Sequence, residues 1–281
     1  MKKLIKILFI LVVFTSCEDK IELDVPIGPT KIVVDGSISN LDDIQRIRLT
    51  TTAPYFDAAP TPALSGADVI VTTNKKDTIH FIENVPKSGN YDATYKIEDT
   101  TLIYTLHITT PAGNKFQSYQ EVLNRVTPID TLYQSEERKK ARGPEEDEVG
   151  YFALMSLKEL KGLGDYYRWI TFINGIQSTD PFDLRISDDR LVDGNEIIDW
   201  DIVYQLFPGD TLEIHQMSIS QREFSYWSLV FTQITNFGGP FDTPPAPIKG
   251  NIFNVNDPNE TVLGYFGVNN VRTASIIIVE K

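Results

Sequence analysis

The clearest chemistry in this sequence belongs to Cys17, which is the only cysteine among the 281 residues. Lysines stand at positions 2, 3 and 6, an apolar run follows over residues 7–14, and Thr15 and Ser16 precede the cysteine. A basic start, a short apolar stretch and small residues are typical of a signal peptide, and a cysteine at its end indicates a lipobox. The thiol of Cys17 is therefore predicted to be acylated after removal of residues 1–16.

Two other interpretations of this N-terminal segment fit less well. A membrane-spanning helix needs about 20 apolar residues, whereas the run from Leu4 to Phe14 is shorter and contains Lys6. An ordinary signal peptide favours an Ala-x-Ala cleavage site, and no alanine precedes Ala53. The expected anchor is therefore a lipid on Cys17, although Phe14 stands where a lipobox more often has leucine.

The other residues with reactive or metal-binding side chains form no recognisable motif. The three histidines lie far apart in the sequence, inside expected strands, so neither a metal site nor a cofactor is predicted. An acidic stretch over residues 188–196 offers clustered oxygens of the kind that calcium binds, but its Asp193-Gly194 pair favours an ordinary turn. The 39 Asp and Glu residues leave a glycosidase-type acid pair open without indicating which two would form it. The histidines are His80, His107 and His215.

The formal net charge of −13 limits the partners that this chain can have. Nucleic acids and anionic lipid surfaces select basic patches, so nucleic acid is not an expected partner and the lipid must supply the membrane attachment. Glu18 and Asp19 follow the cysteine directly. They are similar to the surface-export signal of lipoproteins in Bacteroidota-type bacteria, and a solvated tether explains them equally well. Residues 17–27 are expected to form this acylated tether.

The elements that would position any site are mostly strands. Over residues 28–125, short segments rich in β-branched and aromatic residues alternate with turns rich in Gly, Asn and Pro. This spacing is typical of an immunoglobulin- or fibronectin-like β-sandwich. The fold is therefore predicted to be mainly β, with this sandwich at the N-terminus and a second β-rich module over residues 126–281.

The second module is expected to carry one covering α-helix. Ser220 and Glu223 have the spacing of a capping box, and apolar residues follow at intervals of three and four, which predicts a helix over about 221–236. Residues 134–149 carry blocks of charge without an apolar period, which indicates a solvated loop. The apolar residues expected to pack against a sheet are Phe224, Trp227, Phe231 and Ile234.

Besides the lipobox, seven stretches of the sequence stand out by their order and spacing: Lys31 to Ile38, Gly66 to Val69, Gly89 to Tyr91, Tyr166 to Trp169, Asp189 to Gly194, Gly250 to Asn254 and Leu263 to Phe266. Taken together, they resemble a known family of Bacteroidota lipoproteins, catalogued as domain of unknown function 4249. The resemblance covers nearly the whole mature chain. Family members tend to be encoded beside TonB-dependent outer-membrane receptors, so the resemblance implies such a receptor as partner, and it implies no catalytic residues.

The expected function is therefore non-catalytic binding by a lipoprotein of the outer membrane, in partnership with a TonB-dependent receptor during nutrient uptake. No enzyme activity is expected, since no catalytic motif is assembled. A surface hydrolase of glycan or peptide and a structural subunit of envelope assembly are the alternatives. A proline-rich loop over residues 237–247 supplies the candidate partner-binding residues Phe237 and Phe241. The cell surface is the expected location, with the periplasmic leaflet as the alternative.

Overall fold

The computed structural model describes residues 28–54, 57, 59–136, 139–140, 149–180, 183–236 and 247–281. The predicted signal peptide and tether with Cys17, the candidate residues Phe237 and Phe241, and most of the charged 134–149 segment lie outside these residues. Within the described part of the chain, no helix is both long and apolar enough to cross a membrane.

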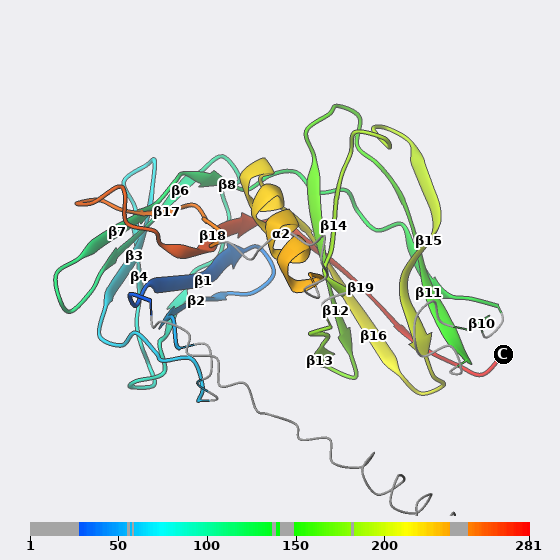
Figure 1. Cartoon of the computed structure of the whole chain (residues 1–281). Coiled ribbons are helices and arrows are strands. Elements are labelled where there is room, and N and C mark those ends of the chain that lie inside the picture. Colours follow the sequence, from blue (N-terminus) through cyan, green and yellow to red (C-terminus); the bar gives the residue numbers. More distant parts are fainter. Residues whose placement is uncertain are drawn as a thin grey trace, which may run out of the picture.

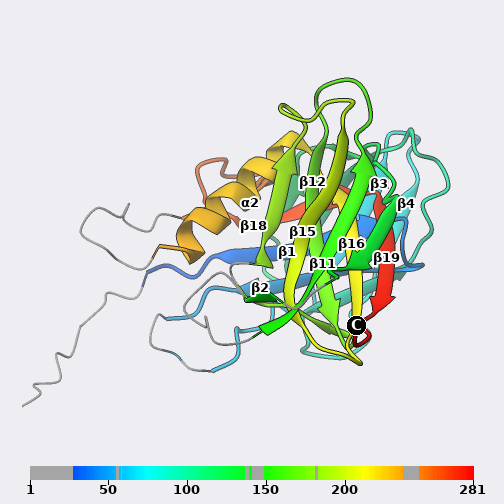
Figure 2. The same cartoon turned by 90° about the vertical axis from the view of Figure 1, so that its right-hand side faces the viewer.

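The structure confirms the mainly β fold: two β-sandwiches lie side by side, and one α-helix, α2 (Gln221–Ile234), lies between them (Figure 1). Each sandwich has its own buried apolar core, and a smaller apolar cluster joins α2 to the second sandwich. Figure 2 turns the second sandwich toward the viewer, with α2 along its side.

The first sandwich buries a core that includes Ile47, Leu106 and Phe116 between two sheets. One sheet has the order β18 (Leu263–Asn269), β1 (Ile32–Ser39), β2 (Ile44–Thr51) and β5 (Asn90–Thr94). The other has the order β17 (Ile252–Asn254), β7 (Lys115–Ser118), β6 (Ile103–Thr109), β3 (Asp68–Thr73) and β4 (Thr78–Phe81), with β8 (Glu121–Val122) beside β6.

Two strands of the first sandwich come from the C-terminal part of the chain. β18 pairs in parallel with β1, and β17 pairs antiparallel with β7. The single boundary expected near residue 125 therefore does not describe how the strands pair. Alternating apolar residues predict that a segment is a strand, but they do not name its partner, and here both partners lie far away in the sequence.

The second sandwich contains a core with Tyr151, Met155, Trp169 and Ile202. One sheet has the order β10 (Lys139–Lys140), β11 (Val149–Lys158) and β15 (Glu196–Leu206), with β9 (Thr131–Gln134) beside β11. The other has the order β13 (Ile176–Gln177), β12 (Tyr166–Ile173), β16 (Thr211–Ser218) and β19 (Val271–Ile277), with β14 (Arg185–Asp188) beside β12. Part of the expected charged loop is thus strand, because β10 pairs with β11.

Helix α2 begins at the predicted residue, since the Ser220 hydroxyl accepts a hydrogen bond from the Glu223 amide at 3.2 Å. The Glu223 side chain does not return to the cap, and it is instead the one buried side chain of the helix. The expected apolar stripe is covered only in its first half: Phe224 and Trp227 pack beside β12, whereas Phe231 and Ile234 remain 37% and 40% exposed.

Candidate functional site

A cleft of about 600 Å³ lies where the two sandwiches and α2 meet. Strands β1, β2 and β18 line it from the first sandwich, and β12, β13 and β16 line it from the second, together with α2. Ligand sites commonly have volumes of about 300–1,000 Å³ and lie at domain junctions. Because three separate parts of the chain form its walls, this interdomain cleft is a candidate ligand site.

Arg168 is the central charged residue of the interdomain cleft. Along β12 the side chains alternate, so that Tyr167 and Trp169 enter the core of the second sandwich while Arg168 faces the cleft. The guanidinium Cζ lies 3.6 Å from the centroid of the Trp227 ring. Burial lowers the pKa of Arg168, and its enclosed Nε atom has no hydrogen-bond acceptor among the described residues. This cation is thus stacked on a ring and feels the charges of Glu223 and Asp35, but no carboxylate bonds to its Nε atom.

Glu223 lies fully inside the wall of the same cleft. Its Oε1 accepts a hydrogen bond from Trp227 Nε1 at 3.2 Å, and its Oε2 accepts one from Asn269 Nδ2 at 3.0 Å. Burial raises the pKa of Glu223 to about 7. Gly267 of β18 leaves room for this carboxyl, because a Cβ there would lie 2.9 Å from Oε2. Both oxygens of Glu223 therefore accept hydrogen bonds from neutral donors, and neither bonds to Arg168.

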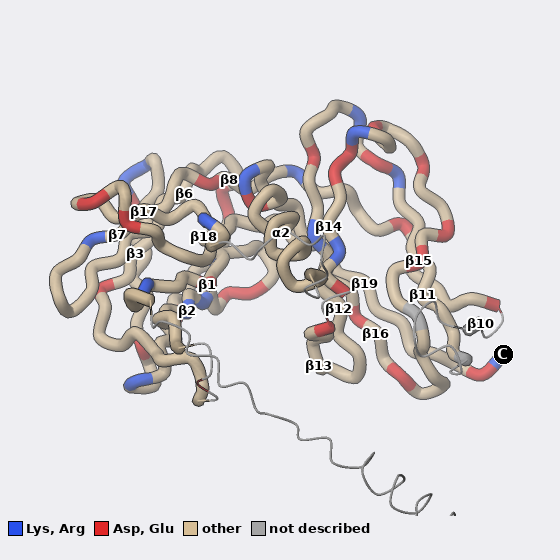
Figure 3. The backbone as a smooth tube through the Cα atoms, viewed as in Figure 1, with Lys and Arg blue, Asp and Glu red and all other residues tan. Residues whose placement is uncertain are grey.

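The first sandwich contributes two more arginines, from β2. Alternation buries Ile47 and Leu49 and turns Arg46 and Arg48 outward, toward the cleft. Arg46 donates two hydrogen bonds to Asp92, at 2.7 and 2.9 Å. Arg48 makes no side-chain hydrogen bond or ion pair within the described ranges. In this acidic chain, basic positions therefore lie on both sides of the junction (Figure 3).

Neutral side chains fix the two sandwiches against each other beside the cleft. Asn269 Nδ2 donates to the Ser218 carbonyl at 3.1 Å, and the Asn270 amide donates to Ser218 Oγ at 3.2 Å. The amide of Val271 donates to Asn40 Oδ1 at 2.6 Å. These bonds join the residue after β1, the end of β16, the end of β18 and the start of β19, so they hold the two walls of the cleft together.

A second cavity of about 240 Å³ lies in the second sandwich. Trp169 and Trp200 line it at right angles, with ring centroids 4.6 Å apart and an interplanar angle of 83°. Trp169 Nε1 donates to Gln216 Oε1 at 3.0 Å, which fixes the ring. Two carboxyl groups, Glu159 and Asp188, also line this aromatic pocket.

The two carboxyl groups of the aromatic pocket have opposite pKa shifts. Burial raises the pKa of Glu159, although its Oε1 accepts hydrogen bonds from Tyr167 Oη at 2.6 Å, Leu160 N at 3.1 Å and Thr127 Oγ1 at 3.3 Å. Hydrogen bonds from Arg190 lower the pKa of Asp188. A pair of acids with divergent pKa values is the arrangement that acid–base hydrolysis uses.

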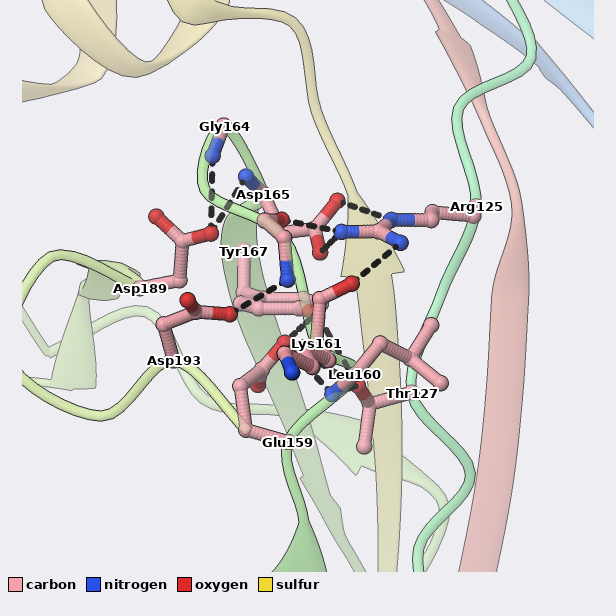
Figure 4. A network of polar contacts seen from close by, with 11 residues as sticks. Arg125, Thr127, Glu159, Leu160, Lys161, Gly164, Asp165, Tyr167, Asp189 and Asp193 are labelled. Carbon is pink, nitrogen blue, oxygen red and sulfur yellow. Dashed lines mark hydrogen bonds and ion pairs between the residues drawn. The ribbon is translucent and has the colours of Figure 1, made fainter. Parts of the chain in front are cut away.

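Figure 4 shows the polar contacts of the acidic residues beside this pocket, among them Asp189 and Asp193. Asp189 accepts hydrogen bonds from the backbone amides of Gly164 and Asp165, at 2.8 and 3.0 Å, and Asp193 accepts one from Gly162. Residues 188–196, for which the sequence suggested either a calcium site or a turn, thus supply side chains that fix the loop before β12. No group of three or more His, Cys, Asp or Glu residues with metal-binding geometry occurs among the residues the structure describes.

The sequence did not identify the residues of the interdomain cleft as a site. Its candidates Cys17, Phe237 and Phe241 lie outside the described residues, so the structure does not place them. One signal was present: Arg168 is a charged residue inside the otherwise aromatic strand Tyr166–Trp169. A cation among aromatic neighbours in an expected strand calls for a partner or a function.

A family model described as domain of unknown function (DUF4249) matches residues 18–275. Comparisons with curated proteins and with solved structures give no significant match.

Proposed function

The chain belongs to the DUF4249 family, and we propose that it is a lipid-anchored outer-membrane protein that acts as a non-catalytic binding partner of a TonB-dependent receptor in nutrient uptake. In this proposal, Cys17 carries the lipid, the interdomain cleft holds the solute, and Phe237 and Phe241 contact the receptor. The lipobox supports the anchor, and the resemblance to receptor-associated lipoproteins supports the partner.

The observation that carries the binding role is Arg168 in the interdomain cleft, with an enclosed Nε atom that has no acceptor among the described residues. A binding site needs a polar group whose partner arrives with the ligand, and Arg168 has no acceptor of its own among the described residues. The neighbouring Glu223 is held by Trp227 and Asn269, so it is not arranged as a base beside a nucleophile. The geometry therefore fits recognition better than covalent chemistry.

The anchor and the partner can be tested by purifying the native protein from its own membrane in mild detergent. A TonB-dependent receptor is expected to accompany the wild-type protein, and mass spectrometry is expected to find Cys17 acylated. Cys17→Ala is expected to leave the membrane fraction if the signal peptide is still processed. Since a lipid confines both proteins to one surface and raises their effective concentration, this variant should also recover less receptor.

The Phe237/Phe241 double alanine variant separates the partner from the contact loop. Loss of the receptor from this variant alone supports the contact proposed for the loop. Equal recovery with both proteins places the contact elsewhere. An unmodified Cys17, or a wild-type protein recovered without any receptor, contradicts the anchor or the partner respectively.

A second candidate function rests on the aromatic pocket. Glu159 as acid and Asp188 as base or nucleophile, beside two tryptophans, would suit hydrolysis of a glycan. We expect no release of reducing ends when the protein is incubated with a panel of oligosaccharides. If release occurs and is lost in Glu159→Gln but kept in Glu196→Gln, a control at an exposed position of β15, the hydrolase replaces the binding protein as the proposal.

A further inference from the structure

We infer that the interdomain cleft binds a small organic anion, in which a carboxylate or phosphate group pairs with Arg168 and an apolar ring or chain lies against Tyr226 and Trp227. This inference deepens the proposed function, because it names the chemical class of the solute that the cleft would hold. Nothing in the family description assigns such a site.

The geometry of Arg168 determines what it still needs. Stacking on Trp227 covers one face of the guanidinium, and the Nε atom on its edge has no acceptor among the described residues. That edge presents a planar fork of N–H groups, which fits a carboxylate or phosphate with two parallel hydrogen bonds. The Nε atom of this fork is enclosed without an acceptor. An incoming anion would satisfy it.

The acidic residues of the cleft do not replace this anion. No Asp or Glu oxygen among the described residues is within ion-pair distance of Arg168. Both Glu223 oxygens are occupied by neutral donors, and its pKa of about 7 reduces its charge near neutral pH. Asp35 lines the cleft from β1, opposite Arg48 in the β1–β2 pairing. Asp35 and Glu223 act on Arg168 through their charge, but neither forms an ion pair or hydrogen bond with it among the described residues.

The rest of the cleft fits the organic part of such a ligand. Tyr226 and Trp227 meet edge to face, with centroids 5.3 Å apart, and Tyr226 also contacts Tyr265 with centroids 5.3 Å apart. These rings form an aromatic wall beside the guanidinium. Ser37, Asn90 and Gln177 add neutral polar groups to the lining. A volume of about 600 Å³ accommodates an anion with an attached ring, rather than an inorganic ion alone.

The test measures ligand binding by isothermal titration calorimetry with the full acylated chain in mild detergent. The probes are benzoate, phenyl phosphate, inorganic phosphate and the neutral benzamide. Benzoate or phenyl phosphate is expected to bind the wild-type protein, and benzamide is expected to bind at least about tenfold more weakly, because it lacks the charge that pairs with Arg168. Comparison of benzoate with phenyl phosphate identifies the head group, and inorganic phosphate measures the contribution of the ring.

Three variants make the test specific. Arg168→Gln is expected to weaken the anion about tenfold or more. Arg48→Gln, an exposed change on the opposite wall, is expected to weaken it less and keeps the test valid if Arg168→Gln does not fold. Arg222→Gln is the matched control, because Arg222 also stacks on a ring, Tyr119 at 4.5 Å, but does not line the cleft.

Equal binding of the anions by the wild type and the folded Arg168→Gln variant overturns the inference. Equal binding of benzamide and benzoate, or binding of none of the four probes, also overturns it. Recovery of the receptor does not depend on any of these results. Failure of the anion site and failure of the proposed partnership are therefore distinguishable.

Discussion

Asn251→Ala is expected to lower the free energy of unfolding by about 3–5 kcal/mol. The Asn251 side chain is fully buried, and its amide bonds to the backbone N–H and C=O of Phe266 in the way that a neighbouring strand would. Its Oδ1 accepts from Phe266 N at 3.0 Å, and its Nδ2 donates to Phe266 O at 2.8 Å and to Glu121 Oε1 at 2.9 Å. Alanine would leave these buried groups short of partners, at about 1–3 kcal/mol for each one left unsatisfied.

Denaturant unfolding of the wild type and the variant measures this loss. Asn259→Ala is the matched control, because Asn259 is exposed, and a change within about 0.5 kcal/mol is expected there. If Asn251→Ala unfolds at the same denaturant concentration as the control, the hydrogen bonds of the Asn251 amide to Phe266 and Glu121 do not stabilise the fold.

Gly250 and Gly264, which lie close to Asn251 and Phe266 in the sequence, are required by the close approach of three backbone segments. A Cβ on Gly250 would lie 1.4 Å from the Gly264 carbonyl oxygen. Gly264 itself has φ +88°, and a Cβ there would lie 1.8 Å from the carbonyl oxygen of Val34. Three backbones thus meet too closely for side chains. The stretches Gly250 to Asn254 and Leu263 to Phe266 contribute to the family resemblance. Their glycines allow β17 and β18 to pack closely against the first sandwich.

Local patterns in the sequence predicted local structure well. Segments rich in β-branched and aromatic residues, separated by turns, predicted short strands over residues 28–125, such as β2, and Ser220 with Glu223 predicted where α2 begins. The sequence did not predict that β18 pairs with β1, because alternation is a property of one strand whereas pairing depends on both. The discontinuous first sandwich therefore emerged only from the structure.

The candidate site was harder to predict, because its charged residues also have ordinary local roles. Glu223 stands at a capping-box position, and only the approach of Asn269 from β18 shows that its carboxyl points inward. Arg168 occupies a strand position that alternation assigns to the face opposite the core. Arg168 differs from an ordinary surface arginine because its guanidinium stacks on the Trp227 ring. This ring comes from α2, which lies far from β12 in the sequence. Sites formed between domains carry little signal in any one segment.

The buried carboxyl of Glu223 is expected to make the stability of the protein depend on pH. Burial raises its pKa from an ordinary 4.5 to about 7, so the folded state holds this proton more tightly than the unfolded state does. Its stabilising contribution is then complete below about pH 4.5 and is lost as the pH rises through 7. A shift of this size corresponds to about 3 kcal/mol, since each pKa unit is about 1.36 kcal/mol.

Measuring the free energy of unfolding between pH 4.5 and 8.5 isolates this group when the wild type is compared with Glu223→Gln. The variant cannot ionise at this position, so the difference between the two proteins is expected to shift by about 3 kcal/mol in favour of the variant as the pH rises. The same substitution at the exposed Glu98 controls for the loss of a surface charge. Parallel pH profiles for the wild type and Glu223→Gln would show that folding does not raise the pKa of this carboxyl.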